Sequence, residues 1–185
     1  MPSTPLDRTA RTRRDVLDAA IEVWALDNTA SLGAVAAAAG VGRTTLNRHF
    51  PDRAALVAAV DAECRARFGQ AVERAELRSG TGWERLRRFC LEVLSLGPVL
   101  GLVFADNALV DPDSWVDGEE DDPFALVVVQ GHQDGSLATD LPLDWVVTHV
   151  WTSLFGAHLI SRSDGPLRHE AGQLLVRTLD RGLAG

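Results

Sequence analysis

Lysine is absent from the 185-residue chain, and only two residues are cysteine. All fixed positive charge on side chains is therefore carried by arginine, whose guanidinium group forms paired hydrogen bonds with phosphates and base edges. Cys64 and Cys90 do not make a disulfide framework, so we expect the protein to work in a reducing cytoplasm. We interpret both as ordinary thiols on helix faces, because redox sensing would need an activated thiolate.

Long hydrophobic segments are missing as well. The longest apolar stretch, residues 98–105, is far shorter than the ~20 residues that a membrane-spanning helix needs. The first residues carry no apolar signal-peptide core, so we expect neither secretion nor membrane insertion. Apolar residues make up 46% of the chain and charged residues 24%, which is typical of a folded protein and excludes disorder along the whole chain.

Acidic residues outnumber basic ones, but unevenly along the chain. The net charge is −8, yet residues 1–53 hold seven arginines and six acids, whereas residues 54–185 hold eleven arginines and twenty acids. A net acidic protein can bind an anion only through a local basic face. The first quarter of the chain is the candidate for such a face.

Apolar residues recur at helical spacing along most of the chain, which predicts an all-α fold. The predicted helices cover residues 12–27, 31–39, 43–49, 53–79, 83–96 and 144–161, with further helices that begin at residue 123 and near residue 167. Periodicity leaves residues 99–110 open between helix and strand, and three consecutive valines at 127–129 would also suit a strand. Residues 111–122 contain seven acids and are expected to form a solvated loop.

Residues 31–50 carry the pattern of a helix-turn-helix, two short helices joined by a glycine-containing turn. Gly40 permits the sharp turn, while Leu46 and Phe50 sit four positions apart and face inward. The outward positions carry donors and methyl-bearing groups of the kind that reach base edges and phosphates, namely Arg43, Thr44, Thr45, Asn47, Arg48 and His49. An αα-corner without a nucleic-acid partner is the alternative. The basic stretch near residue 11 favours the nucleic-acid interpretation.

Residues 12–56 resemble the DNA-binding domain of the TetR family of bacterial transcriptional repressors. The resemblance rests on residues 16–20, on Val35-Ala36 and Ala39-Gly40-Val41, and above all on residues 45–56. It implies a helix-turn-helix DNA-binding domain over residues 1–56 and a helical ligand-binding and dimerisation domain over residues 57–185. It also implies a homodimer that binds a palindromic operator in double-stranded DNA and is released by a small hydrophobic effector, without a cofactor.

The resemblance places the second helix of the motif in the major groove. The DNA-binding residues that it implies are Arg11, Arg13, Arg14, Arg43, Thr44, Thr45, Asn47, Arg48, His49 and Arg53, with His49 and Arg53 on phosphates. Two positions depart from the family. Asn47 stands where tyrosine is common, which weakens a phosphate contact or turns it toward a base. Gly42 replaces the usual serine cap, at a cost of a few tenths of a kcal/mol.

The large apolar residues of the C-terminal part form a core, a ligand pocket, or both. The candidate pocket residues are Phe89, Val93, Phe104, Phe124, Val128, Thr148, His149 and Trp151. Broad apolar stripes on the last two helices predict a four-helix interface between two copies of the chain. Its candidate residues are Val147, Leu154, Phe155, His158, Ala171, Leu174, Leu175 and Thr178.

Other functions have less support from the residues. A small-molecule binding protein of the same fold that has lost operator binding is the first alternative, favoured slightly by Asn47 and by the acidic C-terminal part. An enzyme would need a nucleophile–base pair, a phosphate loop or paired catalytic carboxylates, and we find no such motif. Five scattered histidines and the acidic residues 117–122 follow no firm metal-ligand spacing, so we expect no metal site.

Overall fold

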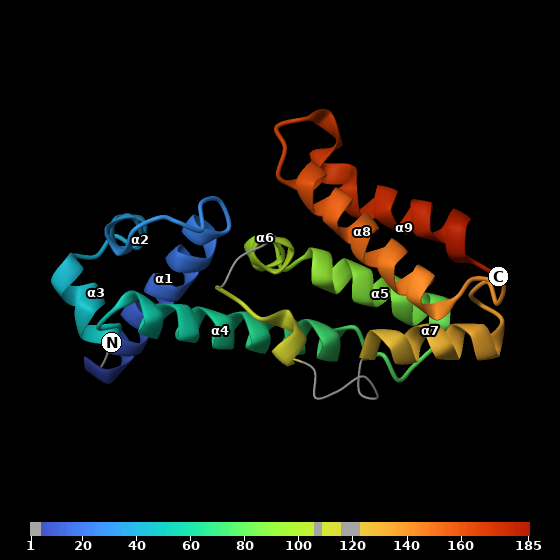
Figure 1. Ribbon diagram of the computed structural model, residues 1–185, viewed down its shortest axis with the longest axis horizontal. Helices are drawn as coiled ribbons and strands as arrows, with labels where there is room; N and C mark the ends of the chain where they lie inside the picture. The colour runs from blue at the N-terminus through green and yellow to red at the C-terminus, as the bar shows by residue number, and fades with distance from the viewer. Residues whose placement is uncertain (1–4, 106–108, 116–122) are drawn as a thin grey trace. The chain divides into compact units, whose positions relative to one another are not determined.

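The computed structural model describes residues 5–105, 109–115 and 123–185 (Figure 1). These residues form α-helices joined by turns and short 3₁₀ segments, which confirms the predicted all-α fold. The α-helices are α1 (Pro5–Trp24), α2 (Leu32–Ala38), α3 (Arg43–His49), α4 (Arg53–Arg74), α5 (Gly82–Leu94), α6 (Pro98–Phe104), α7 (Pro123–Asp134), α8 (Leu143–Ser161) and α9 (Ala171–Leu183). Within the described ranges, no helix is long and apolar enough to cross a membrane.

The chain packs as two compact units. The first comprises residues 1–66 and 101–112, and the second comprises residues 67–100 and 113–185. Both units are defined by packing alone, so a functional boundary at residue 56 stays a prediction.

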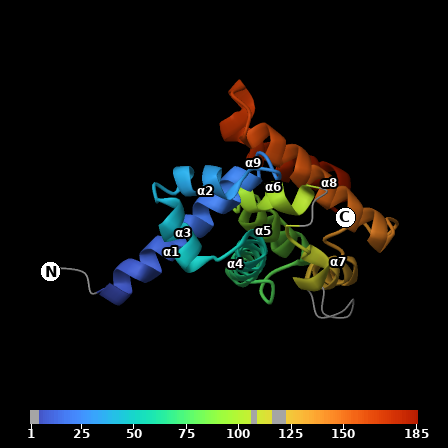
Figure 2. The ribbon, with the colours of Figure 1, turned by 60° about the vertical axis from the view of Figure 1, so that its left-hand side comes forward.

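The first unit is built on the apolar face of α1. Val16, Ala20 and Trp24 are buried on that face, and α2 packs against α1 (Figures 1 and 2). The helix begins at Pro5, earlier than the predicted residue 12, and ends at Trp24 rather than at residue 27. It stops there because the Asp27 carboxylate accepts hydrogen bonds from the backbone N–H and the hydroxyl of Thr29, which closes a turn.

The second unit is held together by a close approach of α5 and α7. Gly82 and Gly131 face each other, and a Cβ atom added at Gly82 would lie 2.2 Å from the Cα of Gly131. Val127 and Val128 are buried, whereas Val129 is 39% exposed. The valine run is therefore helical, because tertiary packing on one helix face outweighs its β propensity.

The N-terminus of α5 is capped from both near and far in the sequence. Thr81 and Glu84 form a reciprocal capping box. The Gly82 N–H donates to Asp134 Oδ2 (2.8 Å), and the Trp83 N–H donates to Ser136 Oγ (2.9 Å). The end of the chain joins the same corner, because the Gly185 N–H donates to the carbonyl of Ser136.

Two further segments differ from the sequence-based predictions, and the segment that the sequence left open is helical in part. The helix α4 ends at Arg74 rather than near residue 79, because Arg88 binds the carbonyls of Ala75, Glu76 and Ser79 in a turn. The ambiguous segment 99–110 contains the helix α6. The last predicted helix is split, since residues 166–170 form a 3₁₀ turn before α9.

Candidate nucleic-acid interface

The α2–α3 pair is formed by local signals. The Ser31 hydroxyl accepts a hydrogen bond from the Ala34 N–H (3.2 Å) and caps α2. Gly40 has a φ of +66°, a backbone conformation that glycine adopts without strain. Gly42 is the N-cap residue of α3, which begins at Arg43, and it makes no side-chain cap bond. Leu46 and Phe50 are buried, as expected from their spacing.

The exposed face of α3 carries four of the six predicted outward residues. Arg43, Thr44, Asn47 and Arg48 are exposed and adjacent on one side of the helix, and the helix contains no acid. Such a face can donate hydrogen bonds to phosphates and to base acceptors in a major groove. Thr45 and His49 are half-buried on its flank, and His49 Nε2 is buried without a hydrogen-bond partner among the described residues. Their role on DNA stays a prediction.

A small groove separates α3 from the start of α2. Its volume is about 310 Å³, and its lining residues are Ser31, Leu32, Gly33, Arg43, Leu46 and Asn47. The Arg43 guanidinium lies directly over Gly33, where an added Cβ would be 2.6 Å from Nη2. Gly33 therefore leaves the space in which Arg43 rests, a relation that the sequence pattern did not reveal.

The Arg53 side chain is engaged inside the first unit. Its Nη1 donates to the carbonyl of Ala30 (2.7 Å) and its Nη2 to the carbonyl of Asn28 (2.6 Å). The guanidinium carbon lies 4.7 Å from the centre of the Trp24 ring, in a cation–π contact. The observed role of Arg53 is thus to tie the start of α4 to the loop before α2. The phosphate role implied by the resemblance would use its remaining donors and stays a prediction.

The three basic residues near position 11 lie on a helix. Arg11, Arg13 and Arg14 are exposed on α1, so the expected arm is helical at these residues. The Arg13 guanidinium lies 5.3 Å from the centre of the Phe50 ring. This contact places positive charge beside the C-terminal end of α3, within the same compact unit.

An aromatic cluster occupies the second unit. The Phe89 ring lies 5.2 Å from that of Phe124 and 6.2 Å from that of Trp151, and the Phe124 and Trp151 rings are 6.1 Å apart. The cluster continues through Phe68, whose ring lies 5.9 Å from that of Trp115. Three of the predicted pocket residues therefore meet, while Phe68 and Trp115 are additions that no helical periodicity signalled.

The other predicted pocket residues divide between core and surface. Val93 and Val128 are fully buried. Phe104 belongs to the first compact unit, whereas the cluster belongs to the second. Thr148 is exposed, and the His149 imidazole is directed to α9, where an added Cβ at Gly182 would be 3.9 Å from Nε2. The structure therefore corrects these two polar choices, because neither side chain is placed among the aromatic rings.

Four of the predicted interface residues are already covered within one chain. Leu154, His158, Ala171 and Leu175 are each exposed by less than 5%, so their side chains cannot form the contact surface for a second copy. Burial also lowers the pKa of His158, with a further contribution from Arg162. The interface prediction chose the apolar faces of α8 and α9 that pack inside the same chain. Val147 and Leu174 are half-buried, and Phe155 and Thr178 are exposed.

The exposed side of α8 shows a different stripe. Trp145 is 61% exposed, Phe155 39% and Leu159 53%, with Thr148 and Thr152 exposed between them. These five residues follow each other at steps of three and four, the spacing of one continuous helix face. We call them the α8 stripe. The spacing is visible in the sequence, but the more hydrophobic core face obscured it.

The described residues include two buried cysteines and no metal-binding group. Cys64 and Cys90 are buried, and neither forms a disulfide among the described residues. Burial raises the pKa of the Cys90 thiol, which argues against an activated thiolate there. Across residues 5–105, 109–115 and 123–185, no group of three histidine, cysteine or acidic side chains could hold a metal ion. The acidic residues 117–122 lie outside the described residues.

The N-terminal helices match a known family of regulators. The family model for bacterial regulatory proteins of the tetR family matches residues 16–60, which span α2, α3 and parts of α1 and α4. The HTH-type transcriptional repressor LfrR of Mycolicibacterium smegmatis is 34% identical over 186 residues, which cover 98% of this chain and 95% of that protein. This chain belongs to the TetR family. Its relatives in that family are transcription regulators.

Solved structures of TetR regulators have the same fold over nearly the whole chain. The crystal structure of LfrR from Mycobacterium smegmatis covers 94% of this chain and 96% of its own, with a TM-score of 0.72 at 31% identity. LfrR in complex with proflavine has a TM-score of 0.68 at 30% identity, with the same coverage. A γ-butyrolactone receptor is similar in fold, with a TM-score of 0.74 over 96% of this chain and 90% of its own at 18% identity.

Proposed function

We propose that this TetR-family protein is a transcriptional repressor that binds a palindromic operator as a homodimer and leaves it when a small hydrophobic effector binds. The observation that carries the proposal is the exposed, acid-free face of α3 formed by Arg43, Thr44, Asn47 and Arg48. It stands on a helix fixed from behind by the buried Leu46. The kinship with the repressor LfrR supports the direction of regulation. Operator binding also places the protein in the cytoplasm.

The decisive experiment measures DNA binding by the full chain. Fluorescence anisotropy with the DNA upstream of the protein's own gene should give saturable binding that a random duplex does not match. Arg48→Ala should weaken operator binding by ~1–3 kcal/mol and relax the preference at one base position. Arg168→Ala is the matched control, since Arg168 is exposed in the second unit and far from α3 in sequence. Equal affinity of the wild type for operator and random DNA would favour a binding protein without operator function.

The homodimer that we propose uses the α8 stripe rather than the buried residues of α8 and α9. Trp145, Phe155 and Leu159 give this helix an exposed apolar face, and Thr178 lies exposed on the neighbouring α9. Leu159→Glu should convert the dimer into monomers in sedimentation velocity and lose operator binding cooperatively. Leu126→Glu is its control, because Leu126 is 49% exposed on α7. A wild-type chain that sediments as a monomer at micromolar concentration would contradict the dimer.

The effector that we propose is a planar aromatic molecule that inserts into the aromatic cluster. The three mutually contacting rings of Phe89, Phe124 and Trp151 support this class, as does the complex of LfrR with proflavine. Proflavine is therefore the first probe. It should raise the melting temperature of the chain and release the operator, because an effector acts only by binding two conformations unequally. Phe124→Leu should reduce both effects together.

A further inference from the structure

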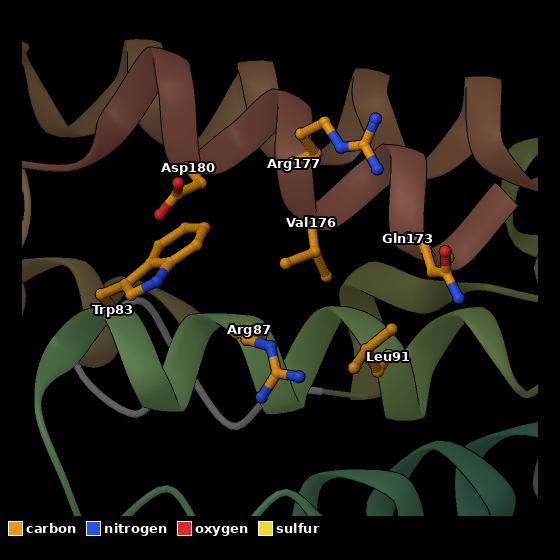
Figure 3. A pocket seen from close by; sticks show the side chains of 8 residues that line it. Trp83, Arg87, Leu91, Gln173, Val176, Arg177 and Asp180 are labelled. Carbon is orange, nitrogen blue, oxygen red and sulfur yellow. The ribbon is translucent and has the colours of Figure 1, made fainter. Parts of the chain in front are cut away.

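A second cavity lies between α5 and α9, on residues that the repressor proposal does not use. Its volume is about 460 Å³, large enough for a bicyclic organic molecule. It is lined by Trp83, Arg87 and Leu91 of α5 and by Gly172, Gln173, Val176, Arg177 and Asp180 of α9. Figure 3 shows that Trp83 and Val176 extend into the space from opposite walls, while the Arg87 side chain lies along α5 and the Arg177 side chain lies along α9.

Two arginines of this groove have no partner within the described part of the chain. Arg87 and Arg177 are exposed, and neither takes part in an ion pair or a hydrogen bond among those residues. Arg88, the next residue on α5, shows the contrast, because its guanidinium binds three backbone carbonyls. In a chain with a net charge of −8, these two guanidinium groups outnumber the single carboxylate of the groove, Asp180, so the groove can attract an anion.

The floor of the groove is apolar. Trp83, Leu91 and Val176 are half-buried between the helices, and the indole of Trp83 presents a flat surface to the space (Figure 3). Gly172 lies against this floor, where an added Cβ would be in ordinary van der Waals contact with a Leu91 methyl group, 3.4 Å away. An aromatic ring can therefore pack here while its polar end reaches the arginines.

The charges in the groove also set the direction of a bound molecule. The Asp180 carboxylate lies beside Trp83, whereas Arg177 is nearly one turn earlier on α9 (Figure 3). Repulsion from Asp180 turns an acidic group away from the tryptophan end and toward Arg87 and Arg177. A ring on Trp83 with its acid group between the arginines satisfies both conditions.

We propose that the groove between α5 and α9 binds an aromatic carboxylic acid, with its ring on Trp83 and its carboxylate held by Arg87 and Arg177. This site is separate from the aromatic cluster proposed for the effector. It is also separate from the face of α9 proposed for dimerisation, because Val176 and Thr178 are two residues apart and point to nearly opposite sides of the helix.

The probe for this site is 2-naphthoate, titrated into the full chain by calorimetry. We expect saturable binding with one molecule per chain. Arg87→Gln and Arg177→Gln should each weaken it at least about tenfold, the loss typical of a hydrogen bond to a charged group. Arg168→Gln, which removes the same charge outside the groove, should leave it within about twofold. The neutral analogue 2-naphthylmethanol should bind at least about tenfold more weakly than the acid.

Two further variants locate the ring. Trp83→Leu should weaken 2-naphthoate binding, and Trp83→Phe should retain most of it. Asp180→Asn should strengthen binding, because it removes a negative charge beside the ring.

Each of three results would overturn the proposal. The first is the absence of saturable binding at up to ~1 mM 2-naphthoate. The second is binding that both arginine variants retain and Phe124→Leu loses, which places the probe in the aromatic cluster. The third is a change from dimer to monomer in Arg87→Gln and Arg177→Gln, which makes the groove a contact between copies of the chain. None of these readouts depends on DNA binding, so the site and the repressor function fail separately.

Discussion

The α2–α3 pair and the helices of the second unit are stabilised over very different distances along the chain. Ser31 caps α2 at Ala34, three positions away, and Gly40 makes the turn by its own conformation. At the start of α5, by contrast, the Gly82 N–H donates a hydrogen bond to the carboxylate of Asp134, 52 positions further on. The comparison teaches that the α2–α3 pair is specified by neighbouring residues, whereas the start of α5 depends on residues that are distant in the sequence.

The largest expected effect is on stability, and it tests the packing of α5 against α7. Gly82→Ala would drive a Cβ into the backbone of Gly131, so we expect a loss of about 3 kcal/mol in the free energy of unfolding, at the upper end for overpacking. Denaturant titration measures it. Gly69→Ala is the control, because an added Cβ on that exposed part of α4 meets nothing within 4 Å. The free energy of unfolding of Gly69→Ala should rise by roughly 0.5–1 kcal/mol. Equal effects of the two substitutions would refute the close approach.

Prediction from the sequence was accurate where the structure depends on neighbouring residues. The bounds of α3, the Ser31 cap and the inward direction of Leu46 all follow from neighbouring residues. It was wrong or incomplete where a distant segment decides. The end of α4 depends on Arg88, and the choice between the two faces of α8 depends on which one the rest of the chain covers. An apolar stripe predicts burial, but it does not say whether the same chain or a second copy supplies the cover.

A smaller effect tests whether Arg53 belongs to the fold or to the DNA contact. Arg53→Ala removes two hydrogen bonds to carbonyls and a contact with Trp24, so the free energy of unfolding should fall by about 1–3 kcal/mol. Arg48→Ala should leave stability within about 0.5 kcal/mol of the wild type. The salt dependence of operator binding gives the second readout. A slope flattened by about one unit in Arg53→Ala without loss of stability would assign the residue to a phosphate.

The next effect is on operator binding, and it tests the contact between Gly33 and Arg43 in the α2–α3 pair. Gly33→Ala should displace the Arg43 guanidinium and weaken operator binding by about 1 kcal/mol, while the helical content stays unchanged. The anisotropy assay measures this loss. In an Arg43→Gln background, Gly33→Ala should have little further effect, because the group that it displaces is gone. Additive losses in the double variant would show that Gly33 acts independently of Arg43.

The smallest effect concerns pH and the distant cap of α5. Hydrogen bonds from the Ser136 side chain and from the Gly82 and Ser136 backbone lower the pKa of Asp134. Its stabilising contribution is therefore full above the ordinary aspartate range, about pH 4, and is lost as the pH falls through the lowered value. The melting temperature of Asp134→Asn should lie below that of the wild type at pH 7, and the gap should close in acid. Asp140→Asn, at an exposed residue, is the control. A gap that persists below pH ~2 would show that the charge is not the cause.

The two buried thiols can serve as built-in probes of local unfolding. Cys64 lies in the first compact unit and Cys90 in the second, and both are fully inaccessible in the folded chain. A thiol-reactive reagent can therefore modify each only during an excursion that opens the surrounding helices. Pulse labelling followed by peptide mass analysis would time the two excursions separately. Modification of both thiols at the same rate would indicate one cooperative unfolding transition. Unequal rates would indicate that the two units open independently.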